Sequence, residues 1–309
     1  MNRFKTATAA IALIAAFAAP MAAQAHRQWI LPSSTVLSGA DAWIGVDGGI
    51  SNGVFISDHA AMRLDNVKVT APDGSDVATE HAQQGQYRST FDVHLTTPGT
   101  YRIANAFSGV NATWTLNGTP GRYRGTAEGL AAAVPAGATD VVSAPSASRL
   151  ETYVTLGDTT TEIFKPTGQG IELVPVTHPN DLVAGEAATF KLIRNGQPLA
   201  DAEVTVARGG TRYRDNPEEL TVKTDADGAF SVTWPEAGMY WVNTTWRPAG
   251  APAPREGAEM PRPPAGQGAP MGGMPGMGGM PGMGGPGGGG RGGPPVEMAS
   301  YTVVLEVLP

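Results

Sequence analysis

A histidine stands directly after a candidate signal-peptidase site near the start of the chain. Residues 1–19 join a short cationic start to a small apolar stretch, and Ala23-Gln24-Ala25 has the Ala-x-Ala form of a cleavage site. A cut after Ala25 makes His26 the first residue of the mature protein. Its free amine and its imidazole could then chelate one metal ion. The alternative is an ordinary first residue without a ligand role.

Two further histidines have a composition that suits metal binding. His59 follows Asp58 in a predicted loop, and His178 lies in the loop Thr177-His178-Pro179-Asn180. A neighbouring Asp or Asn can orient an imidazole toward a metal. The alternative is that both loops are simply polar and solvated. Together with His26, these residues predict a nitrogen-rich site suited to Cu(II), Ni(II) or Zn(II).

The remaining histidines, His81 and His94, lack such a context. His94 alternates with Phe91, Val93 and Leu95, so it faces outward if those three residues face a core. His81 has polar neighbours throughout and is predicted to be exposed.

Methionines in a Gly/Pro-rich segment form a weaker candidate site. They recur at every third residue, and thioethers are soft ligands that favour Cu(I). The alternative is a passive linker of low complexity. The residues concerned are Met271, Met274, Met277, Met280 and Met283.

Composition narrows the function classes. The chain has 309 residues, a formal charge of −7 and no cysteine, which excludes disulfides, thiolate metal sites and a cysteine nucleophile. An acidic chain without a basic patch is a poor candidate for binding nucleic acid. After the signal peptide, no apolar stretch has the length of a membrane span. Motifs of hydrolases, zinc proteases and phosphate-binding loops are absent, so we expect no enzyme. The Ala-rich signal predicts a periplasmic protein.

Strand patterns dominate the rest of the chain. Short alternating runs bounded by Gly, Pro, Asn and Asp recur, as in residues 66–70, 87–95 and 188–193. We predict an all-β protein of two immunoglobulin-like or prealbumin-like β-sandwich domains, at residues 26–165 and 166–309. A short helix is predicted at 127–133. Residues 247–295 are predicted to be a disordered Met/Gly/Pro-rich loop inserted in the second domain, before a last strand at 300–307.

Several segments resemble an exported bacterial family of unknown function whose members are often labelled periplasmic nickel- or cobalt-uptake components. The resemblance covers nearly the whole mature chain apart from the Met/Gly/Pro-rich loop. It implies metal handling in the periplasm, and it singles out His26, His59 and His178, which lie within matching segments. These segments are 26–32 (HRQWILP), 58–64 (DHAAMRL), 87–92 (YRSTFD), 172–180 (ELVPVTHPN) and 209–214 (GGTRYR).

These observations lead to three hypotheses. The first is an accessory protein that binds one late transition-metal ion (Cu, Ni or Co) and passes it to a membrane importer or an outer-membrane receptor. The second is a structural or protein-interaction module without metal, which would offer exposed Trp241 and Trp246 to a partner. The third is a copper oxidase built on His26, which we disfavour because no substrate-binding surface is evident.

Overall fold

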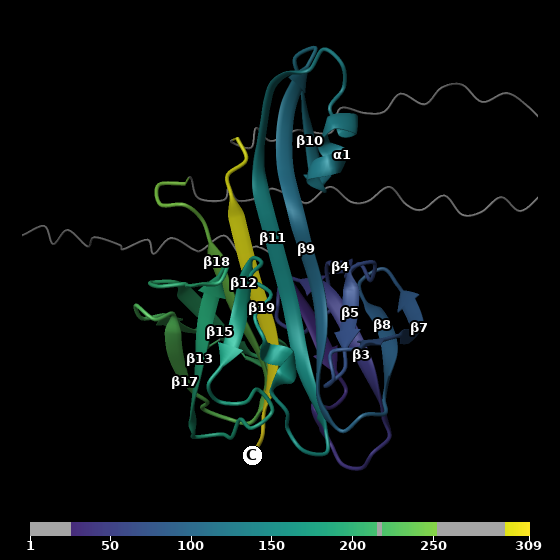
Figure 1. Cartoon of the computed structure of the whole chain (residues 1–309), viewed down its shortest axis with the longest axis vertical. Coiled ribbons are helices and arrows are strands. Elements are labelled where there is room, and N and C mark those ends of the chain that lie inside the picture. The colour runs from purple at the N-terminus through teal and green to yellow at the C-terminus, as the bar shows by residue number, and fades with distance from the viewer. Residues whose placement is uncertain (1–25, 215–217, 252–293) are drawn as a thin grey trace, which may run out of the picture.

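The fold is built almost entirely from β-strands, as the sequence predicts. The computed structural model describes residues 26–214, 218–251 and 294–309 (Figure 1). One α-helix, α1 (Ala127–Ala133), and two 3-10 turns, η1 (Glu162–Phe164) and η2 (Thr211–Tyr213), occur in this part of the chain. No helix in these ranges is both long and apolar enough to cross a membrane. The predicted signal peptide, and most of the predicted loop at 247–295, lie outside the described residues.

The first sheet belongs to the N-terminal half. Its strands lie in the order β1-β3-β8-β7, and β4 pairs with β3. Their bounds are β1 (Arg27–Pro32), β3 (Ala42–Ser51), β4 (Ala60–Ala61), β7 (Thr79–Gln84) and β8 (Ser89–Leu95).

The second sheet is the largest and crosses the whole molecule. Its order is β16-β15-β18-β19-β11-β9-β5-β6, with β10 beside β9 and β2 beside β11. The bounds are β2 (Val36–Leu37), β5 (Val67–Thr70), β6 (Asp76–Val77), β9 (Gly99–Leu116), β10 (Thr119–Gly125), β11 (Thr139–Leu156), β15 (Glu203–Arg208), β16 (Leu220–Lys223), β18 (Gly238–Trp246) and β19 (Met298–Val307).

A third sheet covers the C-terminal half of the second one. It contains β12 (Ile171–Pro175), β13 (Ala187–Arg194), β14 (Gln197–Pro198) and β17 (Ala229–Thr233). The first and third sheets therefore each complete a sandwich with one half of the second sheet (Figure 1).

Each sandwich has its own hydrophobic core. The N-terminal core includes Ile44, Phe91 and Tyr101, and the C-terminal core includes Phe190 and Trp234. Alternation along the strands explains both cores, since every second residue of β8 is buried. The C-terminal core also includes Tyr153 and Ile163, and β11 pairs in parallel with β19 within the second sheet. The boundary at 165/166 stays a prediction.

A third apolar cluster joins the sandwiches and holds β1. Trp29 packs there with Val54, Ala207, Trp241 and Val304. The Trp241 indole N–H donates a hydrogen bond to the carbonyl of Gln28 at 2.9 Å, and Trp241 is only 6% exposed. The prediction that Trp241 is exposed for a partner is wrong. Trp241 stands opposite Val304 and Ala207 on neighbouring strands, and a bulky indole at that position is covered by the first sandwich.

Strands β9 and β11, each of 18 residues, continue beyond the sandwiches as a projecting arm (Figure 1). Strand β10 and helix α1 complete the arm. The side chain of Thr126 caps α1 by accepting a hydrogen bond from the backbone N–H of Gly129. The predicted helix at 127–133 is confirmed in type and extent.

Candidate metal-binding site

The imidazoles of His26 and His59 lie face to face. Their ring centroids are 3.6 Å apart, and the ring planes differ by 10°. His26 precedes β1 and His59 precedes β4. Both strands pair with the same end of β3, since Arg27 stands opposite Ser51 and Ala60 opposite Ile50. Strand register therefore brings together two histidines that are far apart in the sequence.

The loop before His59 is held in place by local contacts. The backbone N–H of Asn52 donates to Asp58 Oδ1 at 3.1 Å, so this carboxylate closes the loop. Phe55 packs edge-on against Trp29, with ring centroids 5.9 Å apart. The Trp29 indole N–H also donates to Ser51 Oγ at 2.9 Å. Asp58 thus positions the backbone that carries His59.

Arg27, the residue after His26, is anchored as firmly as the loop before His59. Arg27 is 8% exposed, pairs with Glu219 at 2.5 Å and lies over the Trp241 ring at 4.9 Å. The His26 side chain itself is exposed, and that of His59 is half-buried. An anchored backbone beside an accessible ring is a suitable arrangement for a ligand that must meet an incoming ion.

The donor set is small and rich in nitrogen. An imidazole lone pair lies in the ring plane, so the two stacked rings must turn to share one ion. Each ring can then offer one lone pair, and a free amine on His26 would add a third. Among the described residues, no group of three or more His, Cys, Asp or Glu side chains is placed to hold a metal. Imidazole donors suit copper, nickel, cobalt and zinc better than calcium or magnesium.

His178 does not join this pair. Its Nε2 lies 3.2 Å from both Thr100 Oγ1 and the Thr160 carbonyl, and its Nδ1 accepts from the N–H of Asn180 at 3.1 Å. Both ring nitrogens are therefore occupied. Thr100 contacts Thr155, and Thr155 pairs with Val36. Val36 follows the last residue of β1, whereas His26 precedes its first residue. His178 connects the loops that bridge the two sandwiches.

Burial lowers the pKa of His178 below its usual value of 6.5, against the opposing effects of Thr160 and Asp181. The unfolded chain therefore takes up a proton at a higher pH than the folded chain does. We expect the free energy of unfolding to fall as the pH drops through 6.5 toward the lower folded pKa. Urea titrations at several pH values should show a weaker pH dependence for His178→Gln. An equal dependence in both proteins would contradict this assignment.

His81 and His94 form a separate exposed group, as predicted. His94 stacks on Trp43 with ring centroids 4.2 Å apart and contacts Asp41 at 3.0 Å. His81 Nδ1 contacts Asp92 at 2.9 Å. Trp43 lies at the end of β3 remote from Ser51, so this group is distinct from the His26–His59 pair. The five candidate methionines, Met271, Met274, Met277, Met280 and Met283, lie outside the described residues.

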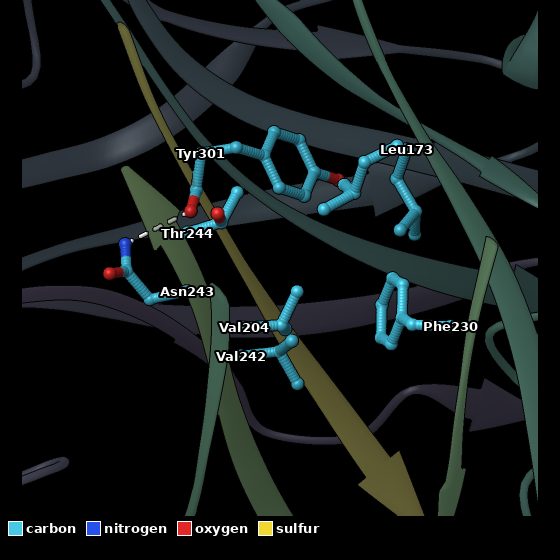
Figure 2. A pocket seen from close by; sticks show the side chains of 8 residues that line it. Leu173, Val204, Phe230, Val242, Asn243, Thr244 and Tyr301 are labelled. Carbon is cyan, nitrogen blue, oxygen red and sulfur yellow. Dashed lines mark hydrogen bonds between the residues drawn. The ribbon is translucent and has the colours of Figure 1, made fainter. Parts of the chain in front are cut away.

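Two cavities differ in what they could hold. A narrow gap lies inside the C-terminal core, where Leu173, Val204 and Phe230 leave no room for water (Figure 2). A polar surface pocket of about 380 Å³ lies next to the loop that carries His59. Sequence reasoning missed this pocket, although part of it is formed by the 87–92 segment that carried the family resemblance. The residues lining it are Ser57, Gln83, Gly85, Gln86, Tyr87, Arg88 and Thr90.

Comparison with known proteins assigns the chain to a family. A model described as "Domain of unknown function (DUF4198)" matches residues 23–247. The chain belongs to the DUF4198 family. The match includes His26, His59 and His178, together with the pocket beside His59. No curated protein matches this DUF4198 chain.

Similar solved structures are distant in sequence. The D0-D1 domain of intimin is 17% identical, with 70% of this chain and 88% of that chain covered and a TM-score of 0.19. Escherichia coli alpha-2-macroglobulin activated by porcine elastase is 12% identical, with 72% and 18% covered and a TM-score of 0.21. At these TM-scores, neither likeness bears on the function of the DUF4198 chain.

Proposed function

We propose that this DUF4198 protein is a periplasmic accessory protein that binds one late transition-metal ion, Cu, Ni or Co, through His26 and His59. The ion is its cargo, which it passes to a membrane importer or an outer-membrane receptor. The stacking of the two rings at 3.6 Å carries the proposal. Two histidines from separate loops meet at an accessible surface, and the amine of His26 becomes a third nitrogen donor once the signal peptide is removed.

The two supports of the pair favour a binding site over chance proximity. Arg27 is fixed by Glu219 and Trp241 on one side, and the loop before His59 is closed by Asp58 on the other. With both backbones held in place, binding an ion requires only rotation of the two side chains, which limits the loss of conformational entropy. His178 is left out of the ligand set, because its nitrogens already have partners within the fold.

We expect His59→Gln to weaken Ni(II) and Cu(II) binding by more than about 100-fold, because it removes an imidazole donor and the loss of an outer partner alone costs about 10- to 100-fold. Calorimetric titration of protein that starts at His26 measures this change. His81→Gln is the control, because His81 is an exposed histidine that contacts Asp92 away from the His26–His59 pair. Equal losses in both variants, or none in either, would count against the proposal.

The projecting arm supports a second candidate function, a protein-interaction module of the cell envelope. Val141 and Val142 on β11 are 48% and 41% exposed, which is unusual for neighbouring valines. This function needs no metal. Protein starting at His26 that takes up no Ni(II), Cu(II) or Co(II) would favour it over metal binding.

A further inference from the structure

The His26–His59 pair leaves coordination positions unfilled. Two imidazoles and one amine provide three donors, whereas square-planar or tetragonal Cu(II) and Ni(II) take at least about four. The described residues supply no third His, Asp or Glu side chain to this pair. A donor from solvent, or from a small molecule that arrives with the ion, can fill a remaining position.

The polar pocket of about 380 Å³ is lined in part by Ser57, in the loop that carries His59, although His59 itself does not line it. Ser57, which lines it, is two residues from His59, so their Cα atoms are at most about 7 Å apart. On the other side of His59, the N–H of Ala61 donates to the carbonyl of Gln86, another lining residue, at 3.2 Å. Pocket and histidine are thus connected at two points.

The chemistry of the pocket favours an anion with several oxygen atoms. Its lining residues include three that carry hydroxyls, two glutamines and one charged residue, Arg88, and none that carries a carboxylate. Arg88 is 57% exposed along its side chain and lies 3.7 Å from Asp47, so this ion pair is loose. A guanidinium in this setting can form two parallel hydrogen bonds to a carboxylate.

We infer that this pocket holds the carboxylate of a small metal chelator, whose other donor groups complete the coordination of the ion at His26 and His59. The protein then takes up its metal as a carboxylate chelate and not as a bare ion. This inference rests on the proposed function. It assigns Arg88 the role of anchoring the organic part of the chelate, while the histidines hold the ion.

Citrate is a suitable probe because it is a carboxylate chelator of Ni(II). Equilibrium dialysis with radiolabelled citrate, with and without Ni(II), measures retention of both components by protein that starts at His26. We expect about one citrate per chain to be retained when Ni(II) is present. Arg88→Gln should bind Ni(II) alone as before but retain citrate at least about tenfold more weakly, because a charge-assisted hydrogen bond is lost. Arg63→Gln is the matched control, since Arg63 is an exposed arginine paired with Asp65 outside the pocket.

The outcomes separate the two proposals. Retention of Ni(II) without citrate would overturn the chelate inference and leave the proposed function intact. Undiminished citrate retention by Arg88→Gln would have the same consequence. Citrate retention that does not depend on Ni(II) would also overturn the inference. Failure to retain Ni(II), Cu(II) or Co(II), with or without citrate, would overturn the proposed function as well.

Discussion

Acetylation of the His26 amine is expected to weaken metal binding by the mature protein more than about 100-fold. Acetylation removes a donor nitrogen and the chelate ring that the amine forms with its own imidazole. Even the loss of an outer hydrogen-bond partner of a metal ligand costs about 10- to 100-fold, so loss of a ligand should cost more. Affinity for Ni(II) and Cu(II) before and after acetylation, measured by calorimetry, checks this result.

The α-amine can be acetylated selectively near neutral pH, because its pKa is about 7.7–8.0 whereas that of lysine is about 10.4. The same difference provides a second readout. Metal must displace a proton from the amine, so the affinity of the unmodified protein should rise as the pH increases from about 6 to 8. At pH values above the range in which imidazole titrates, the metal affinity of the acetylated protein should increase much less with pH than that of the unmodified protein. Equal affinity in the two proteins would rule out a ligand role for the amine.

Glu151→Ala is expected to destabilise the fold by about 3–5 kcal/mol, because it leaves buried groups without their charged partner. Glu151 is 2% exposed on β11. It accepts hydrogen bonds from the hydroxyls of Tyr153 at 2.8 Å and Tyr301 at 2.9 Å, and it pairs with Arg149 at 3.1 Å. Burial and the charge of Glu151 together raise the pKa of both tyrosines well above 10.0, so both remain hydrogen-bond donors. Urea unfolding followed by tryptophan fluorescence measures the loss.

Two variants provide the comparison for Glu151→Ala. Glu151→Gln keeps an acceptor oxygen for the tyrosines but removes the charge, so its loss of stability should be smaller. Glu203→Ala removes an exposed carboxylate and should change the free energy of unfolding by no more than about 0.5 kcal/mol. The structural role of Glu151 would be excluded if its alanine variant were as stable as Glu203→Ala.

Local sequence patterns predicted much of the fold, because side-chain periodicity is a local property. Alternation in β8 indicated that Phe91, Val93 and Leu95 are buried and that His94 faces outward, and the structure confirms this. The predicted strands at 66–70 and 188–193 correspond to β5 and β13 within one residue at each end. The strand β1 was not predicted, because its burial comes from contacts with distant residues such as Trp241 and Val304.

The sequence by itself determined the all-β class, the helix at 127–133 and the candidate role of His26. Only the tertiary structure decided which histidine lies beside it. His59 and His178 have similar loop contexts, yet β3 places His59 against His26, while hydrogen bonds to Thr160 and Asn180 hold His178 elsewhere. The reason is that strand pairing joins segments far apart in the chain. The register of this pairing depends on how both strands pack, and the local pattern of one strand holds no information about its distant partner.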